Sequence, residues 1–178
     1  MLSEGIVETK VIPNGIPTAV FRPADKNVAR RALGIPSDAL VFLSVANRLR
    51  TNRWKDYATL EEALRMASDR LSGRRTLFLG IGDEGPPRRF GDMEFSFVPF
   101  LGEASAMAAY YQAADVFLHA AKVENFPLTV IEALSSGLPV VASDVGGIPE
   151  QVKALTPGGG FGPAEADAIL VPPADPPA

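Results

Sequence analysis

Residues 123–150 read VENFPLTVIEALSSGLPVVASDVGGIPE and predict a loop, a helix and a buried strand in succession. Proline is favoured at the first helical position, so we expect a helix over residues 127–135. Gly137 and Pro139 end this helix, and the apolar VVA of residues 140–142 is typical of a buried parallel strand. Helix and strand together indicate one unit of an α/β fold.

The rest of the chain continues this alternation. In residues 57–71, for example, Leu60, Leu64 and Ala67 fall on one face of a helix, and charged side chains fall on the other. Helices are predicted at residues 26–33, 57–71, 104–113, 127–135 and 149–153. Strands are predicted at residues 39–46, 76–79, 95–98, 116–119, 140–142 and 169–171. This pattern favours an α/β fold with a single Rossmann-like parallel sheet and helices on both faces.

A length of 178 residues and an apolar content of 47% fit one domain with a substantial core. We divide the chain into a lead-in segment over residues 1–23, a domain over residues 24–171 and a Pro-rich tail over residues 172–178, which we expect to be truncated. The PGGG of residues 157–160 and the tail are predicted to be loops.

Composition excludes several classes of function. The net charge of −4 and the pI near 5.1 argue against a nucleic-acid partner. The absence of cysteine excludes disulfides and thiolate metal sites, and the single histidine, His119, excludes a multi-histidine metal site and is most simply structural. No apolar run is long enough for a signal peptide or a membrane span.

Two features of the sequence suit a diphosphate. The free N–H groups at the start of the helix over residues 127–135 include those of Leu128 and Thr129 and are expected to bind an anion. Arg48 and Lys55 follow the first long strand, and ligands of open α/β sheets bind outside the carboxyl ends of strands. A forked guanidinium and an ammonium group are suited to phosphate oxygens.

Two carboxylates complete the pattern. Glu124 lies in the loop before the helix, and Glu132 lies inside it between apolar neighbours. A carboxylate in such packed surroundings needs a partner, and the two hydroxyl groups of a ribose would supply two hydrogen-bond donors. The residues alone leave a simpler interpretation of Glu124 open, in which it interacts favourably with the positive end of the helix dipole.

Glu124-x7-Glu132 followed by GLPVVASDVGGIPE resembles the donor-site signature of the group 1 (family 4) retaining glycosyltransferases, which have the GT-B fold. The VIPNG of residues 11–15, with the FRP of residues 21–23, resembles the start of that family's second domain. The NRL of residues 47–49, with WKDY that follows at Trp54, resembles its basic pair near the donor diphosphate. The similarity spans roughly residues 11–171.

The resemblance implies that this chain is the C-terminal, donor-binding half of a glycosyltransferase. Such an enzyme moves a sugar from a nucleotide-diphosphate sugar to an acceptor with retention of configuration, with no cofactor and no essential metal. Nothing in the chain resembles the N-terminal, acceptor-binding half, which would lie in the same or another chain, so we expect the isolated chain to be inactive. The resemblance also implies a cytoplasmic role in glycan or polysaccharide biosynthesis. Any peripheral contact with the inner face of the membrane would be made by the N-terminal half.

The resemblance also implies residue roles. Glu124 would take the catalytic position, near the reacting carbon of the donor sugar, and Glu132 would hold the ribose hydroxyls. Gly102 falls where such transferases enclose the base, and Gly146 and Gly147 either let the backbone approach the donor or simply form the turn. The predicted donor-binding residues are Arg48, Lys55, Leu128, Thr129, Glu132, Gly102, Gly146 and Gly147.

Two other classes of protein remain open. One is a non-catalytic module that binds a nucleotide sugar, and it predicts binding without transfer. The other is a GT-B-type sugar-nucleotide epimerase, which the combination of the two glutamates with VGGIPE disfavours. The sugar, the base, the acceptor and the oligomeric state are left open by the sequence.

Overall fold

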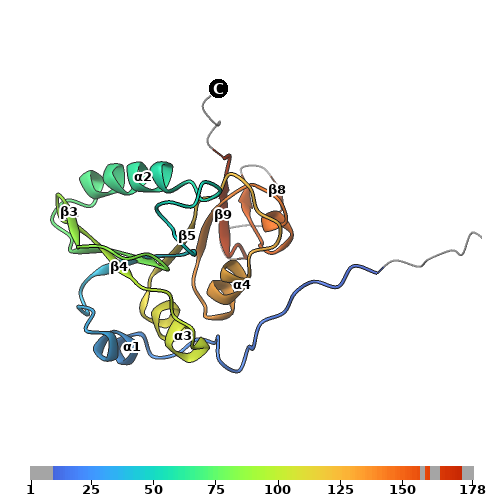
Figure 1. Cartoon of the computed structure of the whole chain (residues 1–178), viewed down its shortest axis with the longest axis horizontal. Helices are drawn as coiled ribbons and strands as arrows, with labels where there is room; N and C mark the ends of the chain where they lie inside the picture. Colours follow the sequence, from blue (N-terminus) through green and yellow to red (C-terminus); the bar gives the residue numbers. More distant parts are fainter. Residues whose placement is uncertain (1–9, 157–158, 161–164, 174–178) are drawn as a thin grey trace, which may run out of the picture.

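A computed structural model of the chain describes residues 10–156, 159–160 and 165–173. Helices and strands alternate along most of the chain, and β2, β3 and β4 follow one another without a helix (Figure 1). The helices are α1 (Lys26–Leu33), α2 (Tyr57–Arg70), α3 (Ala104–Ala113), α4 (Leu128–Ser135) and the 3₁₀ helix η1 (Ile148–Glu150). The strands are β1 (Leu40–Val45), β2 (Thr76–Ile81), β3 (Arg88–Phe90), β4 (Met93–Val98), β5 (Val116–His119), β6 (Val140–Ser143), β7 (Leu155–Thr156), β8 (Gly159–Gly160) and β9 (Ala168–Val171).

A seven-stranded sheet has the order β3-β4-β2-β1-β5-β6-β9, and its neighbours are parallel except for β3, which is antiparallel to β4. From β1 the chain builds outward through β2 to β4. It then crosses to β5, on the other side of β1, and continues through β6 to β9. The strand order therefore reverses between β1 and β5, which is where open α/β sheets bind their ligands.

Helices cover both faces of the sheet, so the predicted fold class is confirmed. Side chains of α1, α3 and α4 share one hydrophobic core with Val41, Leu43 and Phe117 of the sheet. On the opposite face α2 packs with Phe78 and Phe95. Figure 1 shows α2 on one side of the sheet and α1 and α3 on the other.

Asp115 fastens α1 to the amino ends of β1 and β5. Its Oδ2 lies 2.6 Å from Nη2 of Arg30 and accepts a hydrogen bond of 2.8 Å from the N–H of Val41, and its Oδ1 lies 2.7 Å from Nζ of Lys26. Arg30 is only 4% exposed and also donates to the carbonyl oxygen of Ala113. This charged cluster lies at the opposite end of the strands from the carboxyl edge and stabilises the fold.

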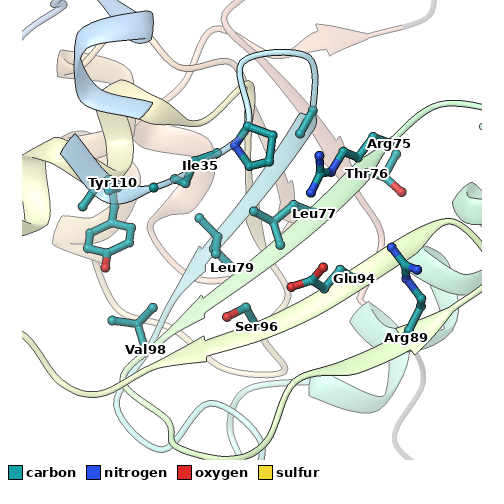
Figure 2. Close-up of a pocket in the computed structure, with 14 residues that line it drawn as sticks. Ile35, Arg75, Thr76, Leu77, Leu79, Arg89, Glu94, Ser96, Val98 and Tyr110 are labelled. Atoms are coloured by element: carbon teal, nitrogen blue, oxygen red, sulfur yellow. The ribbon is translucent and has the colours of Figure 1, made fainter. Parts of the chain in front are cut away.

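The parallel neighbours β2 and β4 are joined by residues 82–92 without a helix. Such neighbours usually need a helical crossover, but here β3 turns back and pairs with β4 instead. One face of the two strands is left as a groove of about 280 Å³, with Leu77 and Leu79 of β2 beside Glu94 and Ser96 of β4 (Figure 2). The short RRF sequence of β3 gave no strand pattern, so this strand was not predicted.

Other departures from the sequence-based prediction lie near the C-terminal end. The helix predicted at residues 149–153 is only the 3₁₀ turn η1, because the N–H of Lys153 bonds to the side chain of Asp167 and takes the chain toward β7. The glycines predicted as loop form β8, which pairs with β7. Residues 157–158 and 174–178 lie outside the described residues. In the part of the chain that the structure describes, no helix has the length and apolar character needed to cross a membrane.

Candidate functional site

The candidate site lies at the carboxyl edge of the sheet. The segment after β1 carries Arg48 and Lys55, and the segment after β5 carries Glu124. The turn after β6 carries Gly146 and Gly147. Because β5 lies between β1 and β6, the topology gathers these three segments at one place.

The N-terminus of α4 presents free backbone N–H groups. Pro127 has a ψ of 119°, so it is the N-cap residue and Leu128 is the first helical residue, one position later than predicted. The N–H of Val130 donates to the carbonyl oxygen of Pro127, but within the described residues those of Leu128 and Thr129 have no acceptor. These two amides, at the positive end of the helix dipole, can receive phosphate oxygens.

A cavity of about 390 Å³ adjoins this helix end. Gly102 from the segment after β4, Thr129 and Glu132 from α4, and Asn47 and Gly82 line it. Gly82 has a φ of +92°, and a Cβ there would lie 2.3 Å from the carbonyl oxygen of Ala46, so only glycine lets these two segments meet. The cavity falls within the usual size range of small-molecule sites.

Glu132 is held in place from the opposite helix. The hydroxyl of Tyr111, a fully buried residue of α3, donates a hydrogen bond of 2.8 Å to Oε2 of Glu132. Burial raises the pKa of Glu132, and the Tyr111 hydrogen bond opposes this shift by stabilising the carboxylate. One carboxylate oxygen is thus fixed, and the other remains for a ligand.

Lys55, Glu124 and His119 form a cluster beside α4. Nζ of Lys55 contacts Oε1 of Glu124, and Nε2 of His119 lies 3.1 Å from the same oxygen and 3.5 Å from Nζ of Lys55. Lys55 and Glu124 also line a hollow of about 260 Å³ with Trp54 and Asn125. The predicted catalytic carboxylate and one predicted phosphate-binding cation therefore face the same space.

Burial sets the protonation states in this cluster. The pKa of His119 is lowered to about 3 by burial and by the nearby charge of Lys55, so its ring is neutral at pH 7. Burial lowers the pKa of Lys55 to about 8, while contact with the Glu124 carboxylate favours the charged ammonium. At pH 7 the cluster is a cation and an anion beside a neutral imidazole.

Arg48 lies on the neighbouring part of the β1 segment, in a hollow of about 320 Å³ with Gly82 and Asp83. Its φ is +55°, a left-handed backbone conformation, and its N–H donates to the carbonyl oxygen of Gly82. Among the described residues its side chain has no ion-pair partner. Arg50, by contrast, already bonds to Asp83 at 3.0 Å, so of these two arginines Arg48 is the one without a carboxylate partner.

Gly146 and Gly147 press against the loop that carries Glu124. A Cβ on Gly146 would lie 1.8 Å from the carbonyl oxygen of Glu124, and one on Gly147 would lie 2.3 Å from that of Asn125. The N–H of Gly147 donates to this Asn125 oxygen at 2.7 Å. The two glycines therefore let the turn after β6 support the Glu124 loop, whatever contact they make with a donor.

Comparison with known proteins identifies the family. The sequence profile described as glycosyl transferases group 1 matches residues 39–178. The chain belongs to the group 1 glycosyltransferases. It is 33% identical over 161 residues to D-inositol 3-phosphate glycosyltransferase from Acidothermus cellulolyticus. The matched region covers 81% of this chain and 35% of that protein. The chain thus spans about a third of the length of the curated relatives it matches first.

Solved glycosyltransferase structures share the fold of this group 1 domain. Sucrose-phosphate synthase from Thermosynechococcus elongatus has a TM-score of 0.68 and 28% identity, over 94% of this chain and 40% of that chain. Anabaena HepE, solved in complex with UDP, has a TM-score of 0.66 and 19% identity, over 93% of this chain and 44% of that chain. These likenesses confirm the predicted GT-B-type sheet and the C-terminal domain assignment.

In this glycosyltransferase domain six of the predicted site residues line three hollows, and the first and third of these share Asn47 and Gly82. Gly102, Thr129 and Glu132 share the first, Lys55 and Glu124 the second, and Arg48 the third. Leu128 lies at the exposed start of α4. The residues that the structure describes include no group of three or more His, Cys, Asp or Glu side chains arranged to hold a metal ion.

Sequence reasoning missed two supporting side chains. Tyr111 stands 21 residues before Glu132 and in another helix, and nothing local in the sequence links them. The sequence predicts a structural role for His119, but its ring contacts Glu124, five residues further along, and Lys55, which the fold brings from the segment after β1. The only available signal was position, because Tyr111 lies on the buried face of α3 and His119 lies at the end of β5.

Proposed function

We propose that this domain binds the nucleotide-diphosphate sugar donor of a retaining glycosyltransferase. The observation that supports this most strongly is the junction at α4. A cavity with a fixed carboxylate borders this helix, two amides at its start have no acceptor among the described residues, and the loop before it carries the Glu124 that contacts Lys55. A ligand with a ribose, a diphosphate and a sugar in sequence has one chemical group for each of these features.

The nucleoside would lie in the cavity lined by Gly102 and Glu132. The free oxygen of Glu132 accepts from a ribose hydroxyl, while Tyr111 fixes the other oxygen. A bound ribose also stabilises the carboxylate against the burial that raises its pKa. Anabaena HepE, which shares this fold, was solved in complex with UDP, a nucleoside diphosphate. This is consistent with the proposed nucleoside position.

The diphosphate would lie across the N-terminus of α4. The amides of Leu128 and Thr129 donate to its oxygens, and Arg48 and Lys55 supply positive charge. When the bond between the sugar carbon and the diphosphate oxygen breaks, the electron pair and the negative charge stay on the diphosphate. Preorganised donors at this position stabilise that developing charge, which is a major source of catalysis in enzymes.

Glu124 would contact hydroxyl groups of the donor sugar and hold its reacting carbon toward the acceptor. Its side chain faces the hollow beside Lys55, next to the proposed diphosphate position. In this role the carboxylate positions the sugar. We propose that the charge of the diphosphate is met by the cations and the helix end, without a bound metal.

Calorimetric titration of the protein with UDP, GDP, ADP and their sugar conjugates tests the proposal. We expect micromolar-to-millimolar binding of one nucleotide, undiminished by EDTA. Glu132→Ala should weaken it about tenfold or more, because a carboxylate hydrogen bond to the ribose is lost. The double variant Arg48→Ala plus Lys55→Ala should weaken the binding of nucleoside diphosphates far more than the binding of the nucleoside alone.

Matched controls separate the site from general charge effects. Glu62→Ala and Arg31→Ala remove exposed charges from the outer sides of α2 and α1 and should leave binding unchanged. Equal losses in site and control variants would contradict the assignment of these residues. Binding without transfer, in a protein that also carries the acceptor-binding half, would instead support a non-catalytic module.

A further inference from the structure

His119 is a buried polar residue at the point where β5 enters the site. It is the last residue of β5, it is 3% exposed, and its ring stacks on that of Phe117 with centroids 6.1 Å apart. Its backbone is part of the sheet, where it pairs with Ala142 of β6. The imidazole is therefore held rigidly, unlike the longer side chains around it.

One atom of His119 meets both charged partners. Nε2 lies 3.1 Å from Oε1 of Glu124 and 3.5 Å from Nζ of Lys55. An ammonium group can only donate, whereas a carboxylate can only accept. A neutral Nε2 that carries its proton therefore bonds to Glu124, and one without the proton accepts from Lys55.

Donor binding changes the balance between these partners. Lys55 contacts Glu124 directly, and both side chains are about five-sixths buried, at 16% and 15% exposure. If Lys55 turns to the diphosphate, as the proposed function requires, Glu124 loses its cation in a largely buried place. A buried carboxylate without a hydrogen-bond donor is energetically unfavourable, and no contact would fix the rotation of its side chain.

We propose that His119 is a positioning residue, whose Nε2–H holds Oε1 of Glu124 in place when Lys55 turns to the donor diphosphate. This inference rests on the proposed donor site. The neutral imidazole supplies the one donor that the carboxylate needs, without a second positive charge beside the leaving group. The other carboxylate oxygen then remains directed to the sugar.

The test compares a sugar nucleotide with its nucleoside diphosphate, using UDP-glucose, GDP-mannose and ADP-glucose against UDP, GDP and ADP. The affinity ratio for the pair that the protein binds contains the contacts to the sugar and the charge difference at the terminal phosphate, and a change in the ratio between variants reports the sugar contacts. His119→Leu removes the donor at similar volume, and we expect the ratio to fall about tenfold in the full-length protein. His119→Gln places an amide N–H near the former Nε2 and should restore most of it.

The outcomes separate the two proposals. If the wild-type protein binds none of these ligands, the proposed function fails, and this inference fails with it. If it binds a nucleotide but the ratio is near one in the wild type, or is unchanged in His119→Leu, only the role of His119 is overturned. A loss that affects both ligands equally, and that His119→Gln does not restore, would make His119 a packing residue. A thermal melt of each variant shows that the protein compared is folded.

Discussion

At the scale of the single residue, Gly146 shows how backbone geometry decides where a functional side chain lies. Its φ is +55°, and its missing Cβ leaves room for the carbonyl oxygen of Glu124. A side chain at this position would collide with the peptide that follows the proposed catalytic carboxylate. Glycine is therefore needed here to support the Glu124 loop, even before any ligand is considered.

Gly146→Ala should consequently damage both stability and the site. We expect a loss of roughly 2 kcal/mol or more in the free energy of unfolding, because a left-handed alanine is strained and the Glu124 loop must move. Urea denaturation measures this. Gly15→Ala is the control, since nothing lies within 4 Å of a Cβ added there and its φ is not in the left-handed region. Similar losses in the two variants would show that the close approach at Gly146 is relaxed at little cost.

Single residues also show which parts of the site could be predicted from the sequence and which could not. The two glutamates, Arg48 and Lys55 could be named as candidates because each belongs to a local pattern. The hydrogen bond from Tyr111 to Glu132 and the contacts of His119 could not, because they join side chains from different elements. Such contacts are set by how helices pack on the sheet, which a spacing rule does not describe.

At the scale of the element, α1 depends on a charge cluster and not only on its short apolar face. Asp25 caps its first turn and Gly34 ends it in a left-handed conformation, which explains the limits that the structure gives this helix. Its attachment to the sheet follows from Asp115, whose Oδ2 accepts hydrogen bonds from both the Arg30 guanidinium of α1 and the backbone N–H of Val41 in β1. Removing this aspartate would leave the Arg30 guanidinium buried without its anion.

Asp115→Ala should therefore lower the free energy of unfolding by about 3 to 5 kcal/mol, the usual cost of breaking one side of a buried ion pair. Lys26→Ala is the matched control. It removes the other cation of the same cluster, but the Lys26 side chain is 46% exposed, so we expect less than about 1 kcal/mol. Urea unfolding curves give both values. A loss for Asp115→Ala as small as the control would mean that water replaces the carboxylate.

Elements with a strong pattern were predictable and those without one were not. α1 and β5 have the predicted limits, because caps bound the first and the second is a short apolar run. α3 also has its predicted limits, although its N-cap residue makes no side-chain hydrogen bond. β3 has only three residues and exists because residues 82–92 are too short for a helical crossover. Pro127 became a cap and not the first helical residue, since its ψ is extended.

At the scale of the whole molecule, one buried base links the site to the stability of the fold. The pKa of His119 falls from about 6.5 in the unfolded chain to about 3 in the folded protein, through burial and the charge of Lys55. Between these values the unfolded state binds more protons, so stability is lost as the pH falls below 6.5. The raised pKa of Glu132 acts in the opposite direction, because its protonated form is favoured by folding.

Comparison with His119→Gln isolates this effect, because the variant keeps Glu132 and the rest of the titrating groups. From pH 7.5 to pH 5.5 the wild-type protein should lose about 1 kcal/mol more unfolding free energy than the variant, within the limit of about 1.4 kcal/mol per pH unit for one group. Urea denaturation at three pH values in this range measures the difference. Parallel pH profiles would mean that the pKa of His119 is the same in the folded and unfolded states, so that the Glu124 carboxylate offsets burial and the charge of Lys55. A wild-type protein that instead gains stability relative to the variant as the pH falls would mean that the carboxylate outweighs both. The same measurement therefore determines which neighbour governs the imidazole that the proposed donor site depends on.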